Sequence, residues 1–308
     1  HDVEYNAGEI THLFITIKGS DVLVSVKVTD WIDQTPVELQ YSFNEKDTNV
    51  EDFDENDVIT FHRLDDEGKV TDSKDYKVEL DENDKKVLVP VDGTPWYRDD
   101  FSDGDRIVAV YPDGSTTYKV PKEQSTFDVN MSGKSDPNNR KNDILVALDG
   151  EIEDGEANVG MNFDHVLSKV TVNIFRGAGF NENEISNSNP VVELIDFYQK
   201  GTIDINYGSV DLDLTSAGTF EPTKLADPNA GAELSYSALI LPQSKGANTA
   251  LVKITFGGNS YYAEYTNAFD FKAGEHNVLN ITLAKTELKL SATIADWKTG
   301  TSGSITID

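Results

Sequence analysis

The chain contains no cysteine in its 308 residues. Cysteine supplies disulfide bonds, thiolate nucleophiles and the sulfur ligands of many structural zinc sites, so all three are excluded. An intracellular protein of this length usually carries a few cysteines. Their absence therefore fits a bacterial exported protein better than a eukaryotic secreted one.

Long apolar stretches are also missing. No run approaches the roughly 18 apolar residues that a membrane-spanning helix needs. Neither a signal peptide nor a cysteine for lipid attachment is visible. These absences say little about export, because leader segments are removed from mature proteins.

Positive charge is scarce. The chain has 26 basic and 55 acidic residues, which gives a formal net charge of −29. Such a field repels nucleic acids and anionic membrane surfaces, so neither is an expected partner. The acidic runs Glu51–Asp57 and Asp81–Asp84 favour solvated surface loops. Asp52, Asp54 and Asn56 begin a calcium-loop spacing, but its glycine and final glutamate are missing, so no metal site is predicted.

Enzyme signatures are absent as well. Gly133-Lys134-Ser135 resembles the end of a phosphate-binding loop, but Asp128 stands where that loop needs a glycine. No Gly-x-Ser-x-Gly turn is present. The five histidines lie far apart in sequence: His1, His12, His62, His165 and His276. We predict no catalytic residues, no metal and no cofactor, and we interpret His165 as a buried structural histidine.

The chain does contain many short alternations of apolar and polar residues, which predict β-strands. Val58–Leu64 and Val191–Tyr198 are examples. Ile107–Tyr111 and Thr116–Val120 flank a Pro-Asp-Gly-Ser turn and predict a hairpin. The apolar residues of Phe163–Lys169 have a helical spacing, which predicts one short helical turn there. The pattern predicts an all-β chain of two tandem β-sandwich domains with few short helices.

An acidic, glycine-containing segment, Asp149–Val159, separates two apolar regions and predicts a domain boundary. We expect an N-terminal hairpin at residues 1–36, a first sandwich at 37–157 and a second sandwich at 158–308.

The N-terminal hairpin is predicted because the chain repeats a piece of itself. With a shift of 266 residues, Ala7–Trp31 aligns with Ala273–Trp297 at nine identical positions. Unrelated segments of this length share about one or two. Val22–Val28 falls on Leu288–Ile294 with its apolar alternation in register, so we expect a strand there, paired in a hairpin with Leu13–Ile17. The alternative is that two hairpins converged by composition.

Aromatic residues offer one candidate for ligand binding. Trp96 and Tyr97 follow a Gly-Thr-Pro turn. They could stack on a sugar or fill the core, and we favour the core. Tyr261 and Tyr262 should point to opposite faces of a strand, with one ring exposed.

Three segments in order resemble one family. Val110–Leu148 contains a Tyr-Pro hairpin followed by Asp-Ile-Leu, and Asn162–Phe175 contains Phe-x-His-x-Leu-Ser-Lys. The third is Leu239–Gln243 (LILPQ), followed by Ala273–Leu283 and the Ala-Asp-Trp that ends at Trp297. This set is similar to the fimbrillin-like (type V pilin or Mfa-like) proteins of Bacteroidales-type bacteria.

The resemblance implies transthyretin-like or immunoglobulin-like Greek-key sandwiches and no catalysis. It implies a structural or adhesive subunit of a surface fimbria, as shaft, anchor or tip, which is exported and held on the outer membrane by a lipid anchor. Partners would be other fimbrial subunits, through strand exchange, and a host or bacterial surface protein or glycan. The alternative function is a surface glycan-binding lipoprotein module.

The repeat suggests where strands are exchanged. Val37, Leu39, Tyr41 and Phe43 alternate cleanly and predict an edge strand of the first sandwich. The matching C-terminal strand includes Ser304, Ile305, Thr306 and Ile307. We expect this tail either to fold onto its own sandwich or to complete the first sandwich of a neighbouring subunit by strand addition.

Overall fold

A computed structural model of the chain describes residues 23–28, 53–97, 100–101, 105–112, 118–151, 158–283, 291–295 and 303–306. These residues form strands, one short helix α1 (Glu184–Asn187) and a 3₁₀ turn at Arg140–Asn142. None of the described helices is long and apolar enough to cross a membrane. The predicted all-β sandwich class is confirmed.

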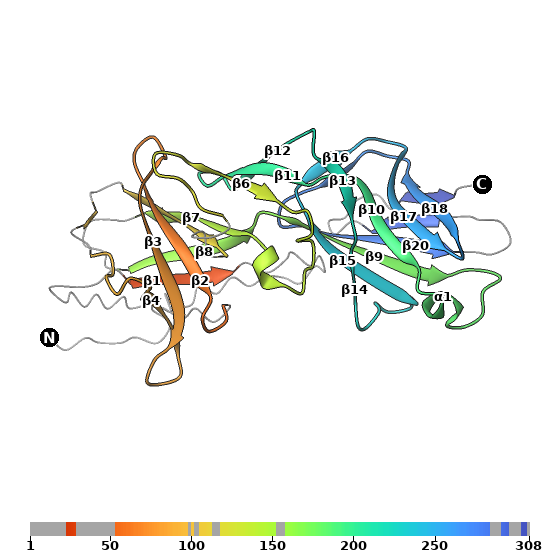
Figure 1. The fold of residues 1–308 in the computed structure, drawn as a ribbon, viewed down its shortest axis with the longest axis horizontal. Helices are drawn as coiled ribbons and strands as arrows, with labels where there is room; N and C mark the ends of the chain where they lie inside the picture. The colour runs from red at the N-terminus through yellow and green to blue at the C-terminus, as the bar shows by residue number, and fades with distance from the viewer. Residues whose placement is uncertain are drawn as a thin grey trace, which may run out of the picture.

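One end of the molecule is built on a seven-stranded sheet (Figure 1). Its strands, in spatial order, are β1 (Leu23–Val28), β8 (Asn158–His165), β7 (Leu145–Glu151), β5 (Arg106–Tyr111), β2 (Val58–Leu64), β3 (Val70–Leu80) and β4 (Lys86–Pro90).

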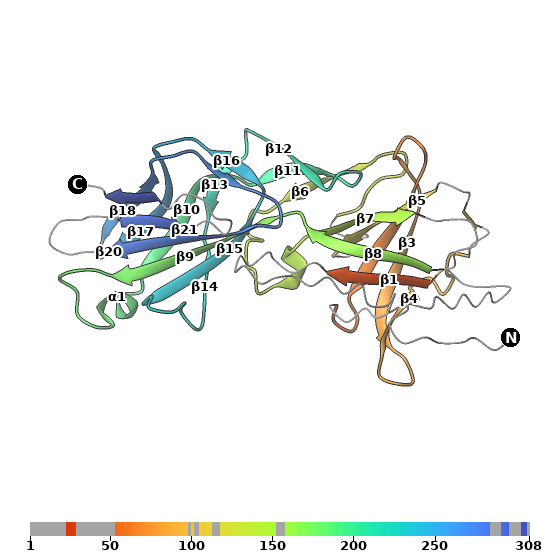
Figure 2. The same ribbon diagram turned by 180° about the vertical axis from the view of Figure 1, so that it is seen from behind.

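The other end is a sandwich of two larger sheets and a small ribbon (Figures 1 and 2). The six-stranded sheet has the order β14 (Thr223–Lys224), β15 (Leu234–Ile240), β9 (Ser168–Arg176), β20 (His276–Leu283), β21 (Ser291–Ala295) and β22 (Gly303–Thr306). The four-stranded sheet has the order β13 (Ala217–Phe220), β10 (Val191–Tyr198), β17 (Thr249–Phe256) and β18 (Asn259–Tyr265). The ribbon pairs β16 (Gln243–Lys245) with β19 (Phe269–Phe271).

A three-stranded sheet lies along one side of the molecule between these two ends. Its order is β12 (Ser209–Leu212), β11 (Lys200–Asp204) and β6 (Thr126–Asn130). The chain itself passes from one end to the other between β8 and β9. The division into ranges 1–36, 37–157 and 158–308 stays a prediction.

The local sequence explains the turns. In the turn after β2, Asp65 accepts hydrogen bonds at Oδ1 from the amides of Glu67 and Lys69, and Gly68 adopts φ +75°. This is the aspartate-led turn with a left-handed glycine that such sequences favour. Asp81 plays the same part between β3 and β4, and those hydrogen bonds lower the pKa of its carboxyl group.

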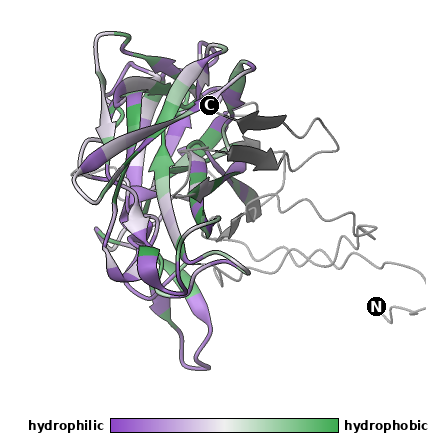
Figure 3. Cartoon of the chain, turned by 90° about the vertical axis from the view of Figure 1, so that its right-hand side faces the viewer, coloured by the Kyte–Doolittle hydropathy of each residue, from purple (hydrophilic) through white to green (hydrophobic). Residues whose placement is uncertain are grey.

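Two apolar clusters hold the sheets together. One face of the seven-stranded sheet packs around Phe53, Phe61 and Trp96. The opposite face belongs to a larger cluster that continues into the second sandwich. Seen from the side, hydrophobic and hydrophilic residues alternate along many strands (Figure 3). The alternation that predicted these strands is therefore what divides each of them between core and solvent.

Most predicted strands are confirmed, and β2 and β10 have the predicted bounds. Two local predictions are wrong. Of the predicted strand Thr116–Val120, the first two residues lie outside the described residues, and Tyr118–Val120 form no strand; Tyr118 and Val120 are buried in the core without a backbone partner strand. Phe163–Lys169 contains no helical turn, because β8 runs directly into β9, and pairing with neighbouring strands overrides the short helical spacing.

Candidate functional site

The C-terminal tail strand lies at the edge of the six-stranded sheet. Ser304, Ile305 and Thr306 belong to β22, which pairs antiparallel with β21. β21 in turn pairs antiparallel with β20. Among the described residues no strand pairs with the outer side of β22. Ile307 lies outside the described residues.

An outermost strand has backbone N–H and C=O groups on one side that no neighbouring strand satisfies. Another extended segment can use these groups as a template, and it then gains a ladder of backbone hydrogen bonds. Among the strands that the structure describes, β22 occupies such a position, and so does β1 at the end of the seven-stranded sheet. These two edges, one near each end of the chain, are the candidate functional site.

The predicted acceptor edge, with Val37, Leu39, Tyr41 and Phe43, lies outside the described residues. The predicted strand at Val22–Val28 is confirmed as β1. β1 pairs with β8 in parallel, from Leu23 opposite Asn158 to Val28 opposite Phe163. Its expected hairpin partner, Leu13–Ile17, is not among the described residues.

The repeated segments have different strand partners. In the repeat alignment β1 overlaps β21, but β1 is parallel to β8 and β21 is antiparallel to β20. The strand that lies parallel beside β9 is β20. In its parallel pairing with β8, β1 therefore corresponds to β20, which pairs in parallel with β9. It does not correspond to β21, the strand that the repeat alignment matches to it. Apolar alternation identified β1 as a strand, but alternation carries no information about the partner or its direction.

Of the two roles considered for Trp96, the structure supports packing in the core. Trp96 is 2% exposed. Its indole N–H donates to Asp72 Oδ2 at 3.1 Å, and its backbone N–H donates to the hydroxyl of Tyr76 at 3.0 Å. Its ring meets Phe101 edge to face. Trp96 is a core residue, as expected.

The exposed tyrosines of the described residues do not form a sugar-binding platform. Tyr97 follows β4, Tyr207 is in the turn between β11 and β12, and Tyr262 lies in β18, so the three belong to different parts of the fold. Tyr261 packs against the core, which leaves Tyr262 as the exposed ring of that pair, as predicted. A glycan platform needs two or three rings in one plane on one face.

The three histidines among the described residues, His62, His165 and His276, lie in structural surroundings. His165 is buried, and its Nδ1 lies 2.9 Å from Asp143 Oδ2. Burial lowers the pKa of His62 to about 4, and burial together with Lys169 lowers that of His276 to about 4. In the part of the chain that the structure describes, no group of three or more His, Asp or Glu side chains is placed to hold a metal ion.

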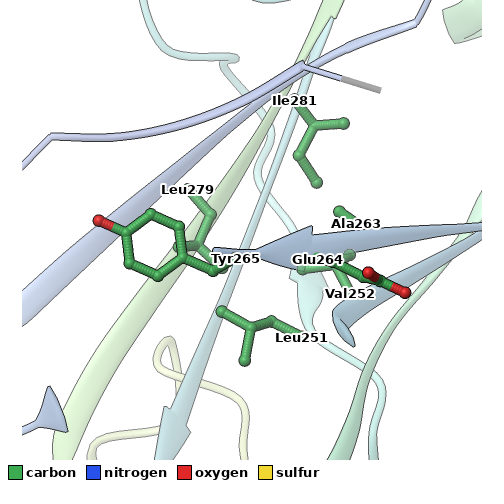
Figure 4. Close-up of a pocket in the computed structure, with 7 residues that line it drawn as sticks. All are labelled: Leu251, Val252, Ala263, Glu264, Tyr265, Leu279 and Ile281. Carbon is green, nitrogen blue, oxygen red and sulfur yellow. The ribbon is translucent and has the colours of Figure 1, made fainter. Parts of the chain in front are cut away.

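One small apolar recess lies beside the edge strand β18 (Figure 4). It encloses about 220 Å³, including its open mouth. Its lining residues are Leu251, Val252, Ala263, Glu264, Tyr265, Leu279 and Ile281. The only polar side-chain groups are one carboxylate and one phenol, so the recess lacks a nucleophile and base pair for catalysis.

Comparison with known families decides the identity. A family model described as fimbrillin-like matches residues 46–297. The chain belongs to the fimbrillin-like family. A search of curated proteins finds no match.

The fold of this fimbrillin-like protein agrees with solved structures. One, from Bacteroides uniformis, has a proposed role in cell adhesion; it aligns with TM-score 0.61 at 15% identity over 92% of this chain and 100% of its own. Another with a proposed cell-adhesion role, from Bacteroides ovatus, aligns with TM-score 0.57 at 13% identity over 90% of this chain and 96% of its own. At these identities the likeness concerns the fold.

The fimbrillin-like family is a class of fimbrial and adhesive structural proteins at the cell surface and not a class of enzymes. The matched range starts shortly before β2 and ends at Trp297, so β1 and β22 both lie outside it.

Proposed function

We propose that this fimbrillin-like protein is a structural and adhesive subunit of a bacterial surface fimbria that assembles by β-strand addition. The observation that carries the proposal is the position of β22, which is the outermost described strand of its sheet in a chain of this family. A strand at the end of a sheet can leave with the loss of one ladder, whereas an inner strand would break two.

In the proposed assembly, the tail with Ser304, Ile305, Thr306 and Ile307 leaves its own sheet and completes the first sandwich of the next subunit. The acceptor is an edge of that sandwich, either the predicted strand at Val37–Phe43 or the outer side of β1. The same hydrogen-bonding groups serve in both places, so the exchange is nearly balanced in backbone hydrogen bonds. The balance then depends on the apolar side chains that the acceptor covers.

We place the protein on the outer membrane, held by a lipid anchor on a segment outside this sequence, with other fimbrial subunits as its partners. A host or bacterial surface protein or glycan would be the adhesive target. The alternative of a glycan-binding module receives no support from the described aromatic residues, because their exposed rings are dispersed.

Deletion of Ser302–Asp308 tests the proposal. We expect a folded monomer and the loss of multimers on the surface of cells that express the full protein, measured by gel mobility of surface material without heating. A conservative change in the tail, Ile305→Val, is the matched control and should keep the multimers, because it preserves an apolar β-forming residue.

The proposal would be overturned by a deletion variant that still forms multimers. It would also be overturned if the deletion unfolded the second sandwich, because the tail would then be a fixed part of its own sheet. Circular dichroism and thermal unfolding of the purified variant distinguish these outcomes from a simple loss of assembly.

A further inference from the structure

The three-stranded sheet β12–β11–β6 joins distant parts of the chain. β6 follows the seven-stranded sheet's β5 in sequence, whereas β11 and β12 follow β10 of the second sandwich. In Figures 1 and 2 this sheet lies on one side of the β8–β9 connection and spans the region between the two ends of the molecule. The two ends are thus attached twice, once covalently and once by strand pairing.

The pairing of β6 with β11 is regular. It is antiparallel, from Lys200 opposite Asn130 to Asp204 opposite Thr126. The ladder continues past both strand ends. The amide of Met131 donates to the carbonyl oxygen of Gln199 at 2.8 Å, and the amide of Ile205 donates to the carbonyl oxygen of Ser125 at 2.9 Å. A single flexible connection would let two bodies rotate about it, but a second, lateral attachment removes that freedom.

Side chains under this sheet join the cores of the two ends. Phe127 and Val129 of β6 and Ile203 of β11 are buried in the larger apolar cluster. The same cluster contains Val108 of the seven-stranded sheet and Val172 of the six-stranded sheet. Separating the two ends would expose this shared apolar surface to water, which is unfavourable.

The tip of the β11–β12 hairpin is also fixed in place. Asn206 donates from its side-chain amide to the carbonyl of Gly68, in the turn between β2 and β3, at 3.0 Å. Gly208 adopts φ +61°, and a Cβ at this position would lie within 4 Å of Val166 and Leu148. The β11–β12 hairpin therefore contacts both the turn between β2 and β3 and the base of the seven-stranded sheet.

We infer that the β6–β11 pairing is a mechanical clasp that makes the two ends of the protein respond to tension as one body. β6 and β11 run roughly along the longest axis of the molecule (Figure 1). Their interstrand hydrogen bonds are therefore roughly perpendicular to a pull along that axis. Such bonds must break together, whereas bonds pulled one by one at a strand end open at lower force. The clasp would be useful to the fimbrial subunit proposed above, but its test does not depend on assembly.

Stretching the full chain between handles fused to its two ends tests the clasp. The wild-type protein should unfold both ends in a single rupture. Val129→Pro removes an amide that pairs with Gly201 in the ladder, and we expect two separate ruptures at lower force. Val129→Ala, the matched control, disturbs the buried packing at the same position but keeps the amide, and should still give a single rupture.

Two separate ruptures in the wild-type protein would overturn the inference. So would a Val129→Pro variant that folds and stretches as Val129→Ala does.

A disulfide keeps the test decisive if the proline variant fails to fold. Asp128 and Thr202 face each other, with Thr202 Oγ1 3.3 Å from Asp128 Oδ1, at a non-hydrogen-bonded position whose Cα separation of about 4.5 Å suits a disulfide.

Oxidation of the double variant Asp128→Cys with Thr202→Cys should raise the rupture force strongly relative to its reduced form. The matched control is Thr255→Cys with Ser260→Cys, which lie opposite each other in β17 and β18 of one sheet, with their hydroxyls 3.3 Å apart. Its oxidation should leave the first rupture unchanged. Equal behaviour of the two oxidised proteins would show that the clasp carries no load. Because the natural chain has no cysteine, each variant can form one disulfide within the chain.

Discussion

The side-chain amide of Asn206 donates a hydrogen bond to the carbonyl oxygen of Gly68 across 138 positions of the chain. Gly68 has φ +75°, and a Cβ built on it would lie 2.5 Å from Asn206 Oδ1. Only a residue without a side chain fits between this turn and the hairpin. The contact therefore depends on glycine for two reasons, its backbone angle and its lack of volume.

Gly68→Ala should lower the free energy of unfolding by about 2 to 4 kcal/mol, since it adds left-handed strain and displaces Asn206. Gly93→Ala is the matched control. Gly93 also has φ +75°, but no atom lies within 4 Å of its Cβ position. It should cost about 1 to 2 kcal/mol from strain alone. Equal losses in urea unfolding would show that the Asn206 contact contributes nothing.

Acid should destabilise the protein through His62. Its Nδ1 lies 2.7 Å from Ser73 Oγ, its Nε2 is buried without a hydrogen-bond partner, and its pKa is lowered from 6.5 to about 4 by burial. Because the folded pKa lies below the unfolded one, only the unfolded chain gains a proton between these values. Stability is then full above pH 6.5 and falls as the pH drops toward 4, by about 3 kcal/mol from this group.

His62→Asn keeps a polar atom near Ser73 and cannot titrate, so it should flatten the fall in unfolding free energy between pH 7 and 4. Burial, with Lys169, lowers the pKa of His276 to about 4, so His276 contributes a further part of the slope. Urea unfolding at several pH values measures both. An unchanged slope in His62→Asn would contradict the assignment.

The sequence predicted those features of the fold that depend on residues close together in the chain. The alternations in Val58–Leu64 and Val191–Tyr198 identified β2 and β10, because each pattern is local. The pairing of β6 with β11 was missed, since it joins segments about 70 positions apart and leaves no local pattern. Very short strands such as β16, with three residues, were missed because tertiary contacts alone define them. The candidate edge residues could be placed on strands, but the parallel direction of β1 could not be predicted.

A chelator should leave the fold unchanged. No group of three or more potential metal ligands is gathered among the described residues, although the chain has 55 acidic residues. A bound ion would raise the melting temperature in proportion to its binding free energy, so its removal would lower that temperature. We expect extensive EDTA treatment to shift the melting temperature by less than about 1 °C. A drop of many degrees, reversed by calcium, would show that an acidic loop holds a structural ion.

A buried polar network crosses three strands of the second sandwich. Asn173 of β9 is 5% exposed. Its Oδ1 accepts from Ser235 Oγ at 2.7 Å and from Asn229 Nδ2 at 2.9 Å, and its Nδ2 donates to Asn280 Oδ1 at 2.9 Å. One side chain thus connects β15, β9, β20 and the loop before β15. Buried polar groups are costly when they lose their partners, so the network should be more sensitive at its centre than at its margin.

Asn173→Ala should lower the free energy of unfolding by about 2 to 4 kcal/mol, because it leaves three partners without their hydrogen bonds. Asn280→Ala removes only one of these bonds and should cost about 1 kcal/mol. The double variant should lose less unfolding free energy than the two single variants lose together, because both single changes remove the same Asn173–Asn280 bond. Urea unfolding of the four proteins measures the coupling. If Asn173→Ala cost no more than Asn280→Ala, the centre of the network would be satisfied by water and not by these side chains.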